Sequence, residues 1–411
     1  MSTRIDIATK NDGKWVRPAE WLPIDSLVSA GQHKFVGLCA VIDGQVSELR
    51  VRVGSVNYTV DWGDGTIETY SSSTYSLSHY YDFSTISSPL TTEGWKQVIV
   101  QIYPTNPIDT FPGYVFVDQS TWNVNNWLDI KMASTTCNSF TISTKKTPYL
   151  KKFTWVGTHQ PLAFVNGWIA SSLEELDIDF TNITSTGSAF QSVGGRIFNE
   201  DDYDLTCAST AMTSTFSSCN LQTLGNLTLT AGATSLLQTF YLSTRLERVG
   251  NISAPTATTM NTIFSGCVNL QKVGTINISG ATSATNAFSS CVALKEVGDI
   301  TTTSVFASIS GMFANCYSLQ KVKLTNCSGL TSAGTAFTNC YSLFSLSLSG
   351  IKVSFSVAST ALNRTALVAL FNDLGIPVTT QIITVTGTPG SPNLTAADIL
   401  IATSKNWTVT L

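Results

Sequence analysis

The sequence has few charged residues and no long apolar run. Only 12% of its 411 residues are charged, about half of what is usual for a soluble domain, and the formal net charge is −4. With 43% hydrophobic residues the chain does not have the composition of a disordered protein, and it lacks the basic excess that nucleic-acid binding requires. Neither a membrane helix nor the apolar core of a signal peptide is present. We therefore expect a protein made in the cytoplasm that binds no nucleic acid and does not insert into a membrane.

The residues and motifs of catalysis are also scarce. The three histidines are scattered along the chain, at His33, His79 and His159. There is no P-loop, no GxGxxG, no HExxH, no GxSxG and no CxxC motif. The nine cysteines are an odd number, and without an export signal we expect them to be reduced and buried. The sequence predicts a protein that is not an enzyme and that holds neither a metal ion nor a cofactor.

What the sequence does contain is a repeat in its second half. Phenylalanine recurs at steps of 24, 24, 24, 25 and 24 residues, at Phe216, Phe240, Phe264, Phe288, Phe313 and Phe337. The spacing of Met260, Phe264 and Cys267 predicts one face of a short helix, and the segment from Val273 to Ile278 predicts a short strand. One such coil cannot bury its apolar face alone. We therefore expect a solenoid of parallel strands over residues 125–350, with the phenylalanines in one buried column.

Two residues in each coil are expected to face outward and to stack from coil to coil. This places Lys151 and Lys152 over Glu174 and Glu175, and it aligns charges of alternating sign in a second column, formed by Lys272, Glu296 and Lys321. Exposed ion pairs of this kind contribute little to stability, about 0–1 kcal/mol each. The second column is therefore interpreted as a candidate contact surface.

The repeat resembles the BspA-type leucine-rich repeats of microbial and viral surface proteins. The hallmark of that family is Met/apolar-x-x-x-Phe-x-x-Cys-x-x-Leu-x-x-Val, and the match covers roughly half of the chain over consecutive copies. The resemblance implies a leucine-rich-repeat β/α solenoid that serves adhesion or forms a structural surface, with no active site.

The period ends after Leu346, and a different element is expected to follow. Two helical patterns and two strand patterns alternate there, and Thr395 and Asp398 form a capping box at the start of the second helix. We expect residues 351–411 to form a strand-helix-strand α/β cap that covers the last coil and packs on Phe344.

The N-terminal region has the pattern of a β-sandwich. Over residues 33–124, strand-like runs alternate with turns, and one turn has the hairpin sequence WGDGT. With the His-x-Tyr motif that begins at His79, this region resembles an immunoglobulin-like sandwich of the polycystic-kidney-disease (PKD) type. Asp61 and Asp64 are also candidates for a calcium or catalytic carboxylate site, although a turn explains Asp64 and an edge strand explains Asp61.

A segment rich in tryptophan and proline precedes the sandwich, within residues 1–32. Its prolines exclude a long helix, so its tryptophans need a surface to bury against. Two alternatives stay open. The segment packs as a strap on its own chain, or it docks onto a partner in a particle, with the candidate residues Trp15, Pro18, Trp21 and Pro23.

The strap and the start of the sandwich resemble the N-terminal portion of structural proteins of tailed bacteriophages, such as tail fibres and adhesins. This likeness implies a homo-oligomeric virion protein, synthesised in the host cytoplasm, that attaches to other virion proteins through its N-terminal region. We expect a tail fibre or receptor-binding adhesin that contacts host polysaccharide or an outer-membrane protein through Lys272, Glu296 and Lys321. A head decoration or fibre protein is the alternative.

Two further classes stay open. A polysaccharide depolymerase needs two carboxylates about 5–9.5 Å apart. The candidates are Glu174 with Asp177, or an acidic loop that contains Glu200, Asp201, Asp202 and Asp204. The loop is otherwise interpreted as a solvated turn or a weak cation site, and Glu174 as part of its lysine ladder. A bacterial surface adhesin is the other class, which the absence of an export signal disfavours.

Overall fold

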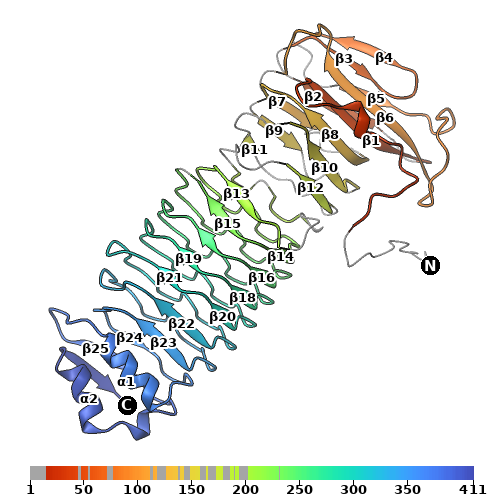
Figure 1. Ribbon diagram of the computed structural model, residues 1–411. Coiled ribbons are helices and arrows are strands. Elements are labelled where there is room, and N and C mark those ends of the chain that lie inside the picture. The colour runs from red at the N-terminus through yellow and green to blue at the C-terminus, as the bar shows by residue number, and fades with distance from the viewer. Residues whose placement is uncertain are drawn as a thin grey trace. The chain divides into compact units, whose positions relative to one another are not determined.

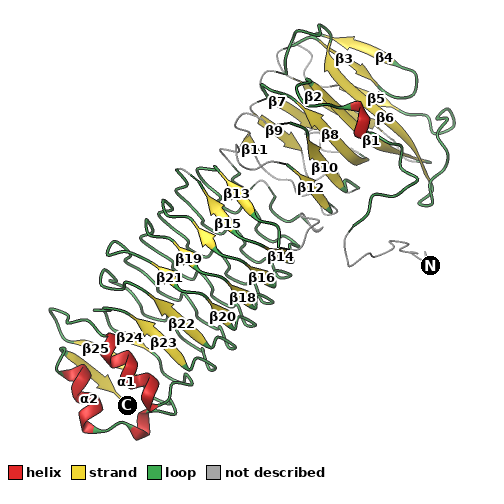
Figure 2. Ribbon diagram, viewed as in Figure 1, coloured by secondary structure: helices red, strands yellow, loops and turns green. Residues whose placement is uncertain are grey.

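A computed structural model describes residues 15–44, 48–53, 56–71, 77–111, 114–117, 126–137, 139–142, 149–157, 163–164, 173–178, 186–188, 190–193, 202–230 and 232–411. Among these residues the fold is β-rich and has two α-helices, α1 (Arg364–Asp373) and α2 (Ala396–Thr403) (Figure 2). The chain divides into two compact units. The N-terminal unit comprises Met1–Ser185 with Ala189–Glu200, and the C-terminal unit comprises Thr186–Ser188 with Asp201–Leu411.

The first sheet of the N-terminal unit has seven strands in the order β12-β10-β8-β1-β6-β3-β4 (Figure 1). The strands are β1 (Lys34–Ile42), β3 (Tyr58–Asp61), β4 (Ile67–Tyr70), β6 (Trp95–Pro104), β8 (Trp127–Ala133), β10 (Lys152–Trp155) and β12 (Glu175–Asp177). β1 pairs antiparallel with β6 and with β8, whereas β8, β10 and β12 are parallel. The pairing of this sheet therefore changes from antiparallel to parallel at β8.

The second sheet of this unit changes in the same way. Its order is β11-β9-β7-β2-β5, with β2 (Glu48–Val53), β5 (Leu77–Tyr80), β7 (Tyr114–Val117), β9 (Ser139–Ile142) and β11 (Ala163–Phe164). β2 pairs antiparallel with β5 and β7, and β7, β9 and β11 are parallel. The domain boundary expected at residues 124 and 125 thus falls within two sheets that continue across it.

Strand β1 lies in the middle of the first sheet and is buried on both faces. After Lys34 its sequence FVGLCAVI is an unbroken apolar run, as a strand covered on both sides requires. Gly37 lies against the ring of Trp127, because a Cβ at this position would come within 2.0 Å of Trp127 Cζ3. The absence of a side chain at Gly37 therefore allows the tryptophan to fill the core.

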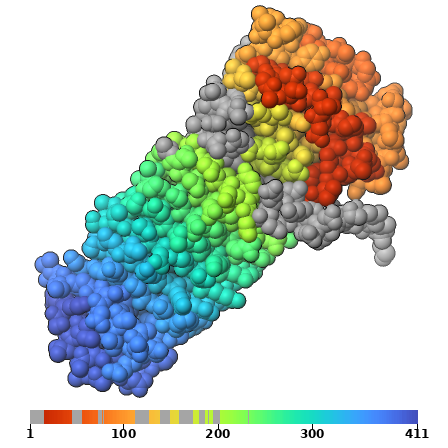
Figure 3. Space-filling model, viewed as in Figure 1, coloured from red at the N-terminus to blue at the C-terminus, as the bar shows by residue number. Residues whose placement is uncertain are grey.

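The C-terminal unit is a parallel solenoid, as the repeat predicts. Its strands are β13 (Leu205–Cys207), β14 (Thr223–Leu224), β15 (Leu227–Leu229), β16 (Arg248–Val249), β17 (Ile252–Ser253), β18 (Lys272–Val273), β19 (Ile276–Asn277), β20 (Glu296–Val297), β21 (Ile300–Thr301), β22 (Lys321–Leu324) and β23 (Ser345–Leu348). They form two columns, β13-β15-β17-β19-β21 and β14-β16-β18-β20, which meet at β22. Within this unit the colour bands of Figure 3 follow one another in sequence order.

The remaining side of each coil is built from turns and not from the expected helix. Thr262 and Gly266 have φ angles of 52° and 77°, which an α-helix excludes. The N–H of Phe264 donates to the carbonyl of Ala287 in the next coil at 2.8 Å, and the N–H of Cys267 closes a turn onto Phe264 at 3.0 Å. The helix prediction was wrong. Turns can also place residues that are four and three positions apart, such as Met260, Phe264 and Cys267, on the same side of the coil.

The phenylalanine column is confirmed. Neighbouring rings are 5.2–6.0 Å apart between centroids, with interplanar angles of 5–21°. Each of the six side chains is at most 1% exposed. The rings therefore form a continuous stack through the centre of the solenoid.

A column of thiols runs beside the rings. Each of its cysteines is a buried free thiol that donates to the carbonyl of a column phenylalanine in the preceding coil, at 3.0–3.1 Å: Cys267, Cys291, Cys316 and Cys340. Ser243 occupies the same position one coil earlier and donates to Phe216 at 2.7 Å. Burial raises the pKa of Cys267 and of Cys340 to about 12. The expectation of buried, reduced cysteines is confirmed for this column, and the structure adds a hydrogen-bonding role.

The last part of the chain forms a three-stranded parallel sheet with both α-helices. The strands are β24 (Phe355–Ser356), β25 (Gln381–Thr384) and β26 (Trp407–Thr410). At the end of α1, the carbonyl of Asp373 accepts the N–H of Gly350 at 2.8 Å. The predicted capping box of Thr395 and Asp398 is present at α2.

Lys405 holds the C-terminal end of α1. Its Nζ donates to the carbonyls of Phe371, Asn372 and Leu374 at 2.7–3.1 Å, which satisfies groups that a helix end leaves unpaired. Phe344 is 45% exposed, so the C-terminal element leaves a large part of this residue open to solvent.

Candidate functional site

The tryptophan-rich strap lies on the first sheet of its own unit. Trp21 and Ile24 are 7% and 1% exposed, and they pack in one cluster with Val36 and Leu38 of β1. Trp15 is partly buried against the same cluster, with its ring centroid 5.9 Å from that of Trp21. Of the two alternatives that the sequence leaves open, the geometry favours packing on the same chain.

Polar contacts hold the strap in place. Arg17 Nε donates to Asp129 Oδ2 of β8 at 2.7 Å, and the other guanidinium nitrogens donate to the carbonyls of Trp21 and Leu22. Asp129 is 2% exposed. Its burial raises the pKa of this carboxyl, and the Arg17 guanidinium opposes that shift only in part. The strap therefore supplies the ion-pair partner of a buried carboxylate, on which Lys152 of the neighbouring strand also acts.

The docking candidates differ in their accessibility. Pro23 is exposed and Pro18 is partly buried, whereas Trp21 is buried. Val16, which directly follows Trp15, is 56% exposed. A partner that approaches the strap would meet Val16 and Pro23, not the ring of Trp21.

The lysine ladder of the N-terminal unit is confirmed. Lys151 Nζ lies 3.4 Å from Glu174 Oε1, and Lys152 Nζ lies 2.7 Å from Glu175 Oε1. Glu174 directly precedes β12, which Asp177 ends. The ion pair with Lys151 gives Glu174 the structural role that the ladder predicts.

The carboxylates of Asp61 and Asp64, in and next to the WGDGT turn, accept hydrogen bonds that hold the turn together. Asp61 Oδ1 accepts the N–H of Gly63 at 3.0 Å, and Asp64 Oδ1 accepts that of Thr66 at 2.9 Å. Asp64 Oδ2 lies 2.6 Å from His79 Nε2. Burial alone would raise the pKa of Asp64, but the hydrogen bonds from His79 and Thr66 outweigh it and leave the pKa below its usual value.

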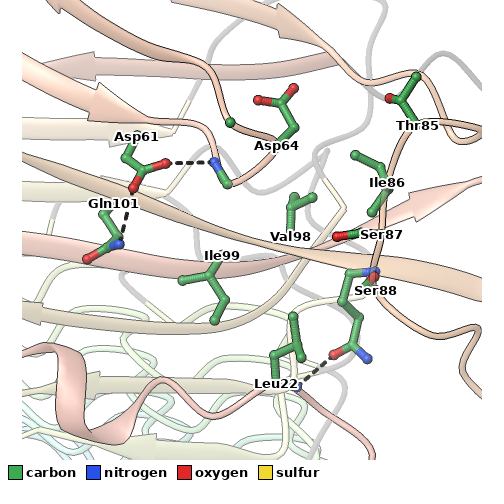
Figure 4. Close-up of a pocket in the computed structure, with 13 residues that line it drawn as sticks. Leu22, Asp61, Asp64, Thr85, Ile86, Ser87, Ser88, Val98, Ile99 and Gln101 are labelled. Atoms are coloured by element: carbon green, nitrogen blue, oxygen red, sulfur yellow. Dashed lines mark hydrogen bonds between the residues drawn. The ribbon is translucent and has the colours of Figure 1, made fainter.

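A depression with a volume of about 560 Å³ lies beside this turn (Figure 4). Sequence reasoning missed this depression, because its walls come from the strap, the turn, β6 and the loop 85–88. Asp61 and Gln101 lie at one end and Leu22 of the strap at the other, with Ile99 between them. Gln101 Nε2 donates to Asp61 Oδ2 at 3.4 Å. Both oxygens of Asp61 are thus bound by the protein itself.

The acidic loop lies only partly within the described residues, because Glu200 and Asp201 fall outside them. Asp202 forms an ion pair with Arg248, with 2.9 Å between Oδ2 and a guanidinium nitrogen. Asp204 Oδ1 accepts the backbone N–H of Asn226 at 2.6 Å. Within the described ranges no group of three or more His, Cys, Asp or Glu residues could hold a metal ion.

The charged column of the solenoid is stacked as predicted. Lys272 is in register with Glu296, and Glu296 with Lys321. Lys272 Nζ lies 3.1 Å from Glu296 Oε2, and both side chains are more than half exposed. Lys321 Nζ instead lies 5.7 Å from the centroid of the Phe344 ring. The column is a solvent-facing surface, and it ends beside an exposed aromatic residue.

Sequence reasoning missed two exposed tyrosines in the last coils of the solenoid. Tyr317 and Tyr341 are 44% and 52% exposed, and their rings stack at 5.7 Å. The signal was available, because each directly follows a column cysteine where earlier coils have Val268 and Val292.

Neither described helix is long and apolar enough to span a bilayer. Comparison of the chain with protein-family models, with curated protein sequences and with solved structures found no match in any of the three.

Proposed function

We propose that the chain is a virion structural protein of a tailed phage, a tail fibre or receptor-binding adhesin whose solenoid contacts the host surface. The observation that carries the proposal is the in-register stacking of outward-facing positions from coil to coil. Extended repeat faces of this kind suit partners that are themselves large and repetitive. The column of Lys272, Glu296 and Lys321 is the proposed host-contact face.

The proposed location rests on sequence likeness. The repeat is similar to BspA-type leucine-rich repeats of surface proteins, and the strap with the following strands is similar to tail fibres and adhesins of tailed phages. We propose synthesis in the host cytoplasm, attachment to other virion proteins through the N-terminal region, and a homo-oligomeric assembly. The host ligand would be a surface polysaccharide or an outer-membrane protein.

We also propose a PKD-like immunoglobulin-type domain in the N-terminal unit. The support is that the residues of the WGDGT and His-x-Tyr motifs meet. The His79 ring stacks on that of Trp62, with 4.6 Å between centroids, and the Tyr81 hydroxyl donates to the Trp62 carbonyl at 2.9 Å. These contacts join the two motifs, which are distant in the sequence, in one packed cluster. At the other end of the chain, we propose that residues 351–411 serve as the cap of the solenoid.

The contacts of the candidate carboxylates favour a binding protein over a depolymerase. Glu174, Asp202 and Asp204 each bind a donor of the protein itself, and such contacts suit a structural role. The proposal therefore assigns no catalytic residue, metal or cofactor.

Mass spectrometry of separated phage heads and tails, with immunogold labelling of intact particles, tests the proposal. We expect the protein in the tail fraction and label at the tail. Label on the head would support the alternative, a head decoration or fibre protein, and absence from purified particles would overturn both.

Deletion of residues 1–30 is expected to abolish incorporation while leaving the solenoid folded. This deletion also removes the Trp21 cluster, so it cannot separate attachment from folding of the N-terminal unit. Val16→Asp with Pro23→Asp is the matched test, because both residues are exposed. Loss of incorporation with unchanged thermal stability would assign attachment to this part of the strap.

A further inference from the structure

The last two coils of the solenoid expose aromatic rings at one corner. We name this corner, formed by Tyr317, Tyr341 and Phe344, the aromatic corner. The three residues are 44–52% exposed. Scattered apolar residues are normal on a protein surface, but three large aromatic residues within two adjoining coils are a feature of contact sites.

Backbone hydrogen bonds fix the positions around the corner. The N–H of Phe344 donates to the carbonyl of Gln320 at 3.1 Å, and the N–H of Gln320 donates to that of Lys295 at 3.0 Å. Lys295, Gln320 and Phe344 therefore form one column across three coils. The next column outward contains Lys321, whose Nζ lies over the Phe344 ring.

Two lysines that make no ion pair within the described residues lie beside the corner, although the chain is acidic overall. Lys272 and Lys323 pair with Glu296 and Asp299. Among the residues that the structure describes, Lys295 and Lys321 have no carboxylate at ion-pair distance. Two exposed ammonium groups thus accompany the aromatic rings.

The groups between the rings are polar. Ser318 and Ser342 follow the two tyrosines, and the Tyr341 hydroxyl donates to Asn339 Oδ1 at 2.8 Å. A protein interface would need a larger apolar centre than two stacked tyrosines and one phenylalanine among hydroxyl and amide groups. A sugar fits this surface better, because its C–H faces can lie on rings while its hydroxyl groups bind amides and serines.

We propose that the aromatic corner is a binding site for an anionic polysaccharide, with sugar faces on Tyr341 and Phe344 and sugar carboxylates at Lys295 and Lys321. This inference deepens the proposed function and rests on it, since it names the class of host ligand and the residues that recognise it. The salt dependence of binding should be strong, because exposed charges are screened by ions.

The solenoid itself provides variants that preserve the fold. Tyr341→Val introduces the residue found at Val268 and Val292, and Phe344→Gln introduces the residue of the preceding coil, Gln320. Val305→Thr is the matched control, because Val305 is 56% exposed and lies outside the corner.

Affinity electrophoresis and calorimetry of the full chain with polygalacturonate, and with neutral dextran of similar length, measure the binding. We expect wild-type protein and the Val305→Thr control to bind polygalacturonate only. The double variant of Tyr341 and Phe344 should bind at least about tenfold more weakly, with an unchanged melting temperature. Lys295→Gln with Lys321→Gln should weaken binding and remove most of its salt dependence.

Equal binding by the wild type and the double variant would overturn the proposal, as would equal affinity for dextran or no binding to either polymer. If the corner variants instead lose adsorption to host cells while the wild type binds neither polymer, the ligand is a protein and the polysaccharide assignment fails. These outcomes are separate from the proposed function. Protein that is absent from the virion but binds polygalacturonate through the corner would overturn the virion location alone.

Discussion

The coils of the C-terminal unit and the sheets of the N-terminal unit are both β-rich, yet their contacts are organised differently. In the coils each contact is a translated copy of its neighbour, as with the Phe264 ring, which lies 5.2 and 5.3 Å from the rings on either side. In the N-terminal unit the decisive contacts occur once, as between Arg17 and Asp129. The repeated contacts can be tested by comparing equivalent residues of different coils. A contact that occurs once has to be tested by changing the charge of each of its partners.

The largest expected effect is on the ring stack. Phe288→Ala removes a fully buried ring and should lower the free energy of unfolding by about 3–5 kcal/mol, measured by urea denaturation. Phe264→Ala should cost the same within about 1 kcal/mol, because the two rings have equivalent neighbours. A clear difference between the two variants would show that the coils are not energetically equivalent.

The second effect concerns the single ion pair. Arg17→Met leaves the Asp129 carboxylate buried without its cation and should cost about 3 kcal/mol at neutral pH. Asp129→Asn in the same protein should restore most of that loss. If the double variant is no more stable than Arg17→Met, Arg17 acts by packing and not by charge.

The pH dependence of this variant follows from the raised pKa of Asp129. The folded protein holds that proton more tightly than the unfolded chain, so stability falls as pH rises from the ordinary carboxyl pKa through the raised one. Without Arg17 the folded pKa rises further, and the cost of Arg17→Met should shrink as the pH falls toward about 4. Unfolding curves at several pH values measure the trend, and a cost that does not change with pH would contradict the assignment.

A smaller effect is expected in the thiol column. Cys291→Ser keeps a donor for the Phe264 carbonyl and should be nearly neutral. Serine already occupies this position in the coil before Cys267, where Ser243 donates to the Phe216 carbonyl. Cys291→Ala removes the donor and should cost about 1 kcal/mol more than serine. Denaturation of the two variants side by side decides the point. A serine variant less stable than the alanine variant would mean that the volume of sulfur matters more than its hydrogen bond.

The smallest expected effect is a gain. Leu242 has a φ of 56°, a conformation unfavourable for leucine, and later coils have Asn315 and Asn339 at the equivalent position. Leu242→Asn should raise the free energy of unfolding by about 0.5–1 kcal/mol, because asparagine tolerates this backbone better. A loss measured by the same denaturation assay would show that contact between Leu242 and the neighbouring coil outweighs the backbone strain.

The sequence predicts the contacts that repeat and leaves open those that do not. The phenylalanine column and the lysine ladder followed from spacing alone, because neighbouring coils must place equivalent residues together. The helix prediction was wrong because the spacing of Met260, Phe264 and Cys267 indicates which residues share a side but does not determine the backbone φ angles. Glycine and asparagine at the position of Gly266 and Asn315 were the available sign of a left-handed turn.

The candidate sites were less accessible to sequence reasoning. The partner of Arg17 lies 112 residues away in the chain, and no period connects them. The burial of Trp21 could not be assigned to its own chain without the sheet on which it packs. The aromatic corner was hidden because Tyr317 and Tyr341 occupy a regular position, and only their exposure distinguishes them from core residues.

The hydrogen bonds that join successive coils have a mechanical consequence. The bond from Phe264 to Ala287 is typical of contacts that link one coil to the next along the stack. A pull on both ends of the solenoid would load these bonds lengthwise and open them one coil at a time, rather than shear many at once. Each 24-residue coil would release roughly 80 Å of chain at an extension of about 3.3–3.6 Å per residue. Under tension the solenoid would thus lengthen in steps and absorb work before its last coil is lost.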